Sequence, residues 1–192
     1  MTKKPFNNPF SSLKNPSPQQ QGEPERRPNP HSQQKGNDRN DRNEKTIDEV
    51  WQELCEENYL QNGYFDHQDY LRIELVTRNT IEPLVKEMAN ARPPLTNHQL
   101  RRFFQHCRAM EARLKAKQSN WSAERVALHK LDQAAADAFG KAEKKIPKIF
   151  HDFIKKNVAT IETEKDFLDG FLKHFEALVG FSAQQLREKE RR

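Results

Sequence analysis

Glycine is scarce in this sequence, and its scarcity excludes several kinds of active site. The 192 residues include six glycines, which are dispersed along the chain. No glycine-rich loop is therefore present to cradle phosphates, and no G-x-S-x-G turn presents a nucleophilic serine. The tight loops that most active sites use are correspondingly few.

Cysteines and long apolar runs are also rare or absent. Cys55 and Cys107 lie 52 positions apart, and neither belongs to a C-x-x-C pair. We interpret both as small, reduced, apolar side chains. No run of roughly 18 apolar residues occurs, which excludes a membrane-spanning helix. The first two lysines are not followed by an apolar stretch, so we expect no secretory signal and a cytoplasmic protein.

The titratable residues form no recognisable catalytic or metal-binding set. The seven histidines are scattered, no pair has H-E-x-x-H spacing, and none lies beside a cysteine at the spacing of zinc ligands. We interpret the carboxylates at 53–57 and 162–169 as solvated helix faces, and His151 and His174 as solvated or phosphate-contacting side chains. The sequence therefore predicts no catalytic residue, no metal and no cofactor, in a protein that is not an enzyme.

Charge is distributed unevenly along the chain. Residues 46–90 hold 3 Lys/Arg against 10 Asp/Glu, a net charge of −7, whereas residues 91–192 hold 21 against 13, a net charge of +8. An acidic segment beside a basic one predicts a polarised surface, with one face for phosphates and another for basic neighbours.

Composition divides the chain into three parts. Residues 1–45 contain seven prolines, seven asparagines and five glutamines but few large apolar residues. Such a segment buries too little surface to offset the entropy lost on ordering, so we predict a disordered tail. A helical domain over 46–182 and a charged C-terminal tail over 183–192 are expected to follow.

The apolar spacing in the domain is that of helices throughout. Thr46 with Glu49 reads as a capping box for a first helix that stops at 62–63, and Asp66 is expected to cap a second. That second helix would carry Tyr70, Ile73, Ile81, Leu84, Val85 and Met88, with a kink or division at Pro83.

Further helices are predicted in the C-terminal half. Thr96 with Gln99 forms another capping box, and helices are expected over about 121–139, from Pro147, and from Thr163. The helix over about 121–139 is expected to pack against its neighbours through Val126, Leu131, Ala135 and Ala138. No alternating strand pattern of useful length is present, so the fold class is all-α: a compact bundle of five to seven helices with a core rich in phenylalanine.

Basic residues on two segments suggest a surface for a polyanion. In the helix that starts at Thr96, the arginines flank the apolar stripe, and a lysine cluster follows with i, i+3, i+4, i+7 spacing that would place four ammoniums on one helix face. Like charges at that spacing repel, so a polyanion would stabilise them; an ordinary solvated surface is the alternative. The candidate RNA-binding residues are Arg101, Arg102, Arg108, Lys141, Lys144, Lys145 and Lys148.

Two stretches resemble a known family. Residues 95–104, LTNHQLRRFF, are similar to the opening of the central helix in the small subunit of Csm-type (type III-A) CRISPR effector complexes, and residues 171–179, FLKHFEALV, are similar to its closing helix. Between them, residues 130–141 occupy the place of a third family segment but lack its proline and tyrosine. The resemblance covers roughly residues 46–182.

This resemblance implies a helical bundle without activity of its own. Copies of the chain would stack head to tail along a ribonucleoprotein and line the groove where guide RNA pairs with target RNA. The chemistry would belong to a large polymerase/nuclease-like subunit and a repeated backbone subunit. Arg101 and Arg102 match the family's basic pair and are the first residues expected to contact RNA phosphates.

Other readings of the sequence predict different behaviour. The chain could be the small subunit of a related CRISPR complex, of Cmr or Cascade type, which co-purifying subunits would distinguish. It could instead be a helical protein–protein adaptor, which would show no salt-dependent RNA binding. A nuclease would require metal-dependent cleavage by the pure chain.

Overall fold

The computed structural model describes residues 44–186, which lie within one compact unit. These residues form helices and no β-strand beyond one isolated bridge between Phe65 and Leu71, so the predicted all-α class is confirmed. The elements are α1 (Ile47–Cys55), the 3₁₀ turn η2 (Ile73–Leu75), α2 (Arg78–Asn90), α3 (Asn97–Lys115), α4 (Trp121–Gly140), α5 (Lys148–Thr160), the π-helical turn η3 (Asp166–Phe171) and α6 (Leu172–Ser182). No helix in this range is long and apolar enough to cross a membrane.

Local signals place most helix starts where the sequence predicts them. At Thr46 and Thr96 the threonine hydroxyl accepts a hydrogen bond from the backbone three residues on, and the side chain of Glu49 or Gln99 accepts one from the threonine N–H. Both capping boxes are thus confirmed. Pro147 directly precedes α5, where its missing N–H leaves no donor unsatisfied.

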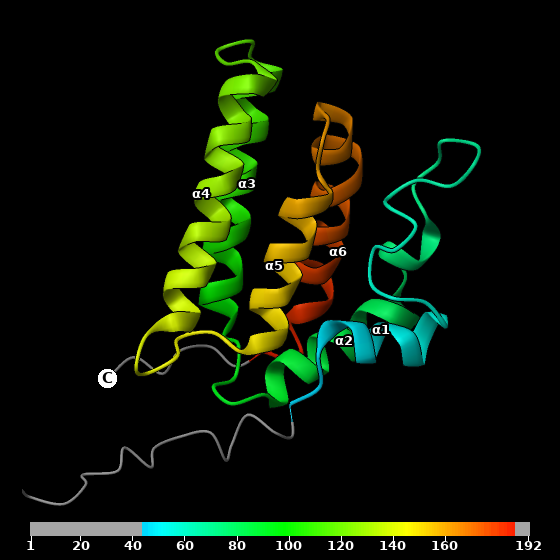
Figure 1. The fold of residues 1–192 in the computed structure, drawn as a ribbon, viewed down its shortest axis with the longest axis vertical. Coiled ribbons are helices and arrows are strands. Elements are labelled where there is room, and N and C mark those ends of the chain that lie inside the picture. The colour runs from blue at the N-terminus through cyan, green and yellow to red at the C-terminus, as the bar shows by residue number, and fades with distance from the viewer. Residues whose placement is uncertain (1–43, 187–192) are drawn as a thin grey trace, which may run out of the picture. The chain divides into compact units, whose positions relative to one another are not determined.

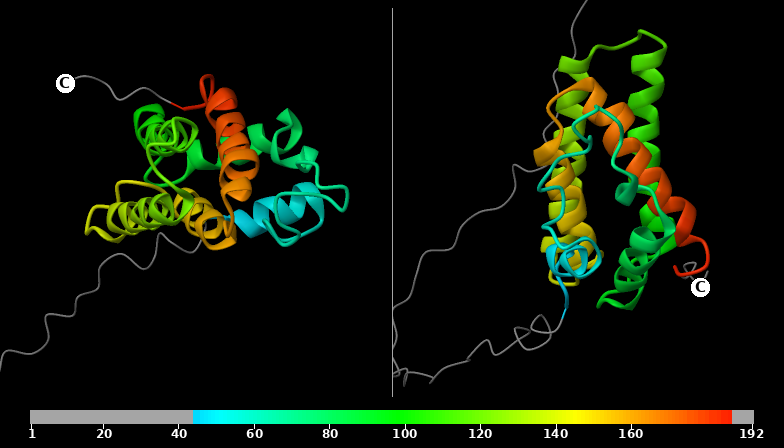
Figure 2. Two further views of the ribbon diagram at one scale, coloured as in Figure 1. Left: turned by 90° about the horizontal axis from the view of Figure 1, so that it is seen from above. Right: turned by 90° about the vertical axis from the view of Figure 1, so that its right-hand side faces the viewer.

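The helices pack as two antiparallel hairpins (Figure 1). The pair α3 and α4 lies beside the pair α5 and α6, with α4 against α5 and α3 against α6. The short helices α1 and α2 pack together at one end, α1 against α5 and α2 against α6, as the two views of Figure 2 also show. The N-terminal ends of α3 and α5 therefore point to the same end of the bundle, where the connection between α4 and α5 also lies.

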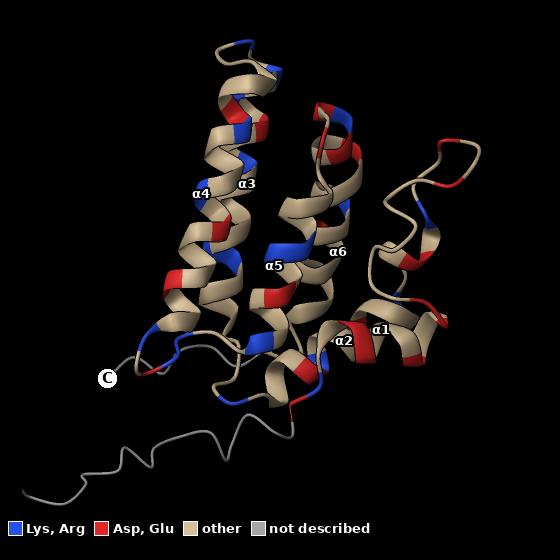
Figure 3. Cartoon of the chain, in the orientation of Figure 1, with Lys and Arg blue, Asp and Glu red and all other residues tan. Residues whose placement is uncertain are grey.

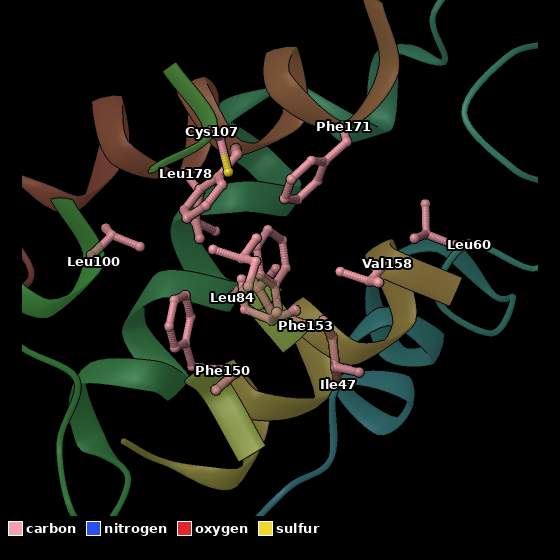
Figure 4. Close-up of a cluster of buried hydrophobic side chains, with 14 of the residues drawn as sticks. Ile47, Leu60, Leu84, Leu100, Cys107, Phe150, Phe153, Val158, Phe171 and Leu178 are labelled. Atoms are coloured by element: carbon pink, nitrogen blue, oxygen red, sulfur yellow. The ribbon is translucent and has the colours of Figure 1, made fainter. Parts of the chain in front are cut away.

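Phenylalanine fills the centre of the bundle, as the helical spacing predicts. Figure 4 shows Phe150 and Phe153 of α5 in one cluster with Phe171 of η3, and the Phe153 and Phe171 ring centroids are 6.2 Å apart. Phe167 and Phe175 are also fully buried, and the Phe153 and Phe175 rings meet edge to face with centroids 5.4 Å apart. The interpretation of these rings as core is confirmed.

The segment 56–77 differs from the expectation of two long helices. Helix α1 ends at Cys55 because Glu56 takes a left-handed conformation, φ 59°, and α2 begins only at Arg78. Asp66 caps no helix; its carboxylate accepts the backbone N–H groups of Gln68 and Tyr70, which closes a turn instead. From here on, residues 56–77 are called the 56–77 segment.

Three side chains expected in the core are on the surface. Tyr70 and Ile73 are 68% and 64% exposed because they belong to the 56–77 segment rather than to α2. Val126 of α4 is 60% exposed, and Leu128 takes the expected place with Leu131 and Ala135. Helix α2 runs without division through Pro83.

The two predicted tails are mostly outside the described residues. Of the tail predicted over 1–45, only residues 44 and 45 are described, and its disorder remains a prediction. Helix α6 ends at Ser182, and Leu186, in the predicted C-terminal tail, is buried; the boundary between domain and tail stays a prediction.

Candidate nucleic-acid interface

The solvent face of α3 carries the three arginines predicted from the sequence. Arg101 is exposed, and its Nε donates to Oδ1 of Asn97 at 3.1 Å, a bond that holds the guanidinium along the helix. Arg102 is exposed and forms no ion pair or hydrogen bond within residues 44–186. Neither arginine forms an ion pair with a carboxylate in the described part of the chain, so both guanidinium groups are open to an external anion.

Arg108 is different because it already has an internal partner. Its Nη1 lies 2.6 Å from a carboxylate oxygen of Glu111, which is only 8% exposed and also pairs with Lys115 at 2.7 Å. A buried carboxylate without cations nearby would be costly. The structure therefore assigns Arg108 first to the stability of α3, although its sequence position resembles that of Arg101.

A second buried carboxylate occupies the contact between α3 and α4. Arg113 donates from Nε and Nη2 to the two oxygens of Glu124, at 2.8 and 2.7 Å. These hydrogen bonds hold the pKa of Glu124 below its usual value. Sequence reasoning missed this pair and that of Glu111, because nothing local distinguishes a buried glutamate from an exposed one.

The lysine cluster does not lie on a helix face, and that expectation is wrong. Helix α4 ends at Gly140, Lys141 is its C-cap in an extended conformation, and α5 starts only at Lys148. Lys144 and Lys145 thus belong to the α4–α5 loop, residues 141–147. Gly140 and Pro147, which end one helix and start the next, were the signals that separate the two helices.

Each of the four lysines interacts with a neighbouring side chain. Lys141 pairs with Asp137 at 2.7 Å, Lys145 with the exposed Glu143 at 3.0 Å, and Lys148 with Asp152. The Lys144 ammonium lies 4.7 Å from the centre of the Phe139 ring. The pairs of Lys141 and Lys145 are exposed and therefore weak, so a phosphate can displace their carboxylates at little cost, whereas the Asp152 side chain is only 18% exposed.

Phe139 is not available as a stacking platform for bases. Its ring stacks against His151 with centroids 4.8 Å apart and an interplanar angle of 11°. Parallel rings at that distance leave no room for the Lys144 ammonium between them, so it covers the opposite face. The sequence suggested that His151 is a solvated side chain. That interpretation is wrong, because the side chain is only 16% exposed.

The loop and α3 meet through one side chain. The Nε2 group of Gln99 donates to the backbone carbonyl of Lys145 at 2.5 Å. Arg102 lies three residues beyond Gln99 and so on the same side of α3, near the loop. Arg101 and Arg108, seven residues apart, lean to the other flank. The helical spacing therefore places Arg102 on the side of α3 that bonds to the loop, and Arg101 and Arg108 on another side.

The acidic segment lies elsewhere in the molecule. Figure 3 shows lysines and arginines on α3, on α4 and in the α4–α5 loop, and acidic residues on α1 and in the 56–77 segment. Glu57 is not part of a solvated face: it accepts hydrogen bonds from Arg72, Trp51 and Asn62. Burial opposes ionisation of Glu57, but these bonds outweigh it and lower the pKa.

His174 is fully buried, which corrects its interpretation as a solvated or phosphate-contacting residue. Its Nδ1 lies 2.5 Å from the carbonyl oxygen of Leu75, and its Nε2 lies 2.6 Å from the hydroxyl of Tyr59. Cys107 is also fully buried, and burial raises the pKa of its thiol, in keeping with an inert apolar side chain. Neither residue reaches the surface where the arginines lie.

A comparison with protein families decides where the chain belongs. The family model described as Csm2 Type III-A matches residues 78–184, which is 107 of the 192 residues. The chain belongs to this family. It is thus a small subunit of Csm type, and the resemblance seen in the sequence is confirmed. No curated protein and no solved structure matched the chain.

The matched range covers the whole candidate interface. It runs from the start of α2 to the end of α6 and includes all seven candidate residues. Helix α1 and the 56–77 segment lie outside it, although both pack on the matched helices. The basic surface thus belongs to the part that this chain shares with its family.

Proposed function

We propose that this Csm-type small subunit is non-catalytic and binds the backbone of guide and target RNA without sequence specificity. Its place would be a cytoplasmic type III-A CRISPR ribonucleoprotein that serves antiviral defence. The observation that carries the proposal is the exposed pair Arg101 and Arg102 on α3, which forms no ion pair with a carboxylate within residues 44–186.

Recognition of phosphates fits the chemistry of this surface. Guanidinium groups bind phosphate oxygens through paired hydrogen bonds. This binding releases counterions from the nucleic acid, which favours association with any sequence. The aromatic rings of the α3–α4 side are packed or covered, as Phe139 shows, so they offer no faces for stacking bases. Binding would therefore follow the RNA backbone and depend strongly on salt.

The double substitution Arg101→Ala/Arg102→Ala is expected to weaken RNA binding roughly tenfold and to reduce the salt dependence by about two units of slope. The measurement is the fluorescence anisotropy of a labelled RNA at several salt concentrations. Arg125→Ala/Lys130→Ala is the matched control, because it removes two exposed cations from the outer side of α4. Equal losses in both variants would show that only net charge matters and would contradict the proposed interface.

We further propose that the chain assembles with the large polymerase/nuclease-like subunit, with the repeated backbone subunit and with copies of itself. The net charges of −7 over residues 46–90 and +8 over residues 91–192 support complementary contacts. Exposed Tyr70 and Ile73 add apolar surface to the acidic side.

Charge reversal on the acidic side tests this assembly. Glu53→Lys/Glu56→Lys is expected to lower co-purification of the other Csm subunits severalfold, because it turns attraction into repulsion. Glu57 must be left intact, since its bond to Arg72 supports the fold. The control Glu162→Lys/Glu164→Lys reverses two exposed charges in the residues that precede η3. Recovery of the complete assembly with Glu53→Lys/Glu56→Lys would exclude this acidic face as a docking surface.

A further inference from the structure

Gln99 has two different hydrogen-bonding tasks, and they use opposite ends of its amide. The Oε1 atom accepts from the backbone N and from Oγ1 of Thr96, each at 2.9 Å, which completes the capping box of α3. The Nε2 group donates to the carbonyl of Lys145 in the α4–α5 loop. A glutamate would serve the cap equally well. The amide is required by the bond to the loop.

The Lys145 backbone is held from two sides. Its N–H donates to the carbonyl of Ala138 in α4 at 2.8 Å, and its carbonyl accepts from Gln99 of α3. The buried side chains of Ile146 and Pro147 anchor the loop just beyond. The loop backbone is therefore pinned between two helices at the residue from which its charged side chains extend.

The bond to Gln99 matters because the loop is rich in like charges. Residues 141–145 carry three lysines against one acidic residue, Glu143, and Arg102 lies one helical turn from Gln99. The excess of cations on this side of the molecule favours their separation, so a fixed loop backbone opposes movement of the lysines away from α3. Keeping the loop lysines near α3 costs free energy when no ligand is present. The same arrangement makes the binding of a polyanion more favourable.

We propose that Gln99 is a positioning residue for phosphate binding: its carboxamide holds Lys144 and Lys145 beside Arg102, so that the three cations meet one stretch of nucleic-acid backbone. This inference rests on the proposed RNA-binding function. It adds that the interface includes the α4–α5 loop and that its geometry depends on an uncharged residue which itself contacts no phosphate.

Gln99→Glu separates the two tasks, because the carboxylate keeps the cap and loses the donor to Lys145. The expected result is a roughly fivefold to tenfold loss of affinity for labelled RNA and a slope against salt that is lower by one to two units. Thr96→Val is the matched control: it removes the hydroxyl from the cap and leaves the bond to the loop. That variant is expected to lose stability with an unchanged salt slope.

A double-mutant cycle removes the effect of the added negative charge. Gln99→Glu is combined with Lys144→Ala/Lys145→Ala, and the loss of affinity is compared in the two backgrounds. If Gln99 acts through the lysines, its substitution has little further effect once they are gone. Gln99→Met, which is uncharged, is measured in the same cycle, and thermal unfolding confirms that each variant is folded.

The outcomes distinguish this inference from the function on which it rests. Losses that simply add in the cycle would show that Gln99 does not act through the loop lysines and would overturn the inference alone. RNA binding that is insensitive to Arg101→Ala/Arg102→Ala would overturn the proposed interface itself. Non-additive losses with a reduced salt slope would support both.

Discussion

Replacing Gly170 by alanine is expected to lower the free energy of unfolding by about 3 kcal/mol. Gly170 is buried in the π-helical turn η3, and a Cβ added there would lie 2.6 Å from Cγ and 2.9 Å from Cβ of Tyr64. Those atoms are close to the Tyr64 backbone and the ring is fully buried, so the side chain cannot swing away. Relief of the clash requires the 56–77 segment to move off the last helix.

Gly180 provides the matched control for this substitution. It lies in α6, is exposed, and has nothing within 4 Å of a Cβ placed on it. Gly180→Ala should therefore raise the free energy of unfolding by about half a kcal/mol through helix propensity alone. Chemical denaturation of the two variants measures both effects. Similar small changes in the two variants would mean that the close contact of Tyr64 with Gly170 does not constrain the fold.

Helix starts and the composition of the core could be predicted from the sequence because their causes are local. The Thr46 and Thr96 capping boxes involve residues three apart, and the phenylalanines of α5 and α6 repeat with helical spacing. The exposure of Arg101 and Arg102 follows from the same spacing. Each of these signals lies within a few turns of one helix.

The 56–77 segment could not be predicted because its conformation is set by distant residues. The hydroxyl of Tyr59 meets His174, 115 positions away, and Tyr64 meets Asn157, 93 positions away. The apolar residues of this segment mimic a helical pattern, but these contacts hold it in turns. Lys165 adds a further tie, since it pairs with Asp69 and its ammonium lies 4.5 Å from the centre of the Phe65 ring.

The candidate site was predicted in part, for similar reasons. Spacing indicated the charges of Lys141 to Lys148 but placed them on one helix, because the i, i+4 pattern takes no account of Gly140 and Pro147. The ion pairs could not be predicted from the sequence either. The ion pair of Arg113 with Glu124 joins two helices, and only the fold shows that Arg102 has no such partner within residues 44–186.

The contact between the 56–77 segment and the last helices contains a chain of buried hydrogen bonds with one consistent direction. A carbonyl cannot donate, so Nδ1 of His174 carries the proton and donates to Leu75. Nε2 is then the acceptor for the hydroxyl of Tyr59, whose oxygen accepts from Nδ2 of Asn157 at 2.8 Å. Oδ1 of Asn157 accepts from the hydroxyl of Tyr64. Every polar side-chain atom in this series of hydrogen bonds has a suitable partner only if His174 is neutral.

Stability is therefore expected to fall by about 3 kcal/mol as the pH is lowered from 6.5 to about 4. Burial lowers the pKa of His174 to about 4, from an ordinary value of 6.5. Between these two values the unfolded chain binds a proton that the folded chain does not, so acid favours unfolding. The contribution of the neutral imidazole is complete above pH 6.5 and is lost as the pH falls toward 4.

Urea unfolding at pH 7, 6 and 5 measures this loss above the range where carboxylates such as Glu124, whose pKa is lowered by Arg113, begin to protonate. His174→Gln is the matched variant, because a glutamine amide can donate to Leu75 and accept from Tyr59 without titrating. Its free energy of unfolding should change less between pH 7 and pH 5 than that of the natural chain. An identical pH dependence in the two proteins, or an imidazole of His174 that titrates near 6.5 by NMR, would show that the buried hydrogen-bond chain tolerates the charged ring. The 56–77 segment would then be held mainly by its apolar contacts, with Tyr64 against Gly170 the first of them.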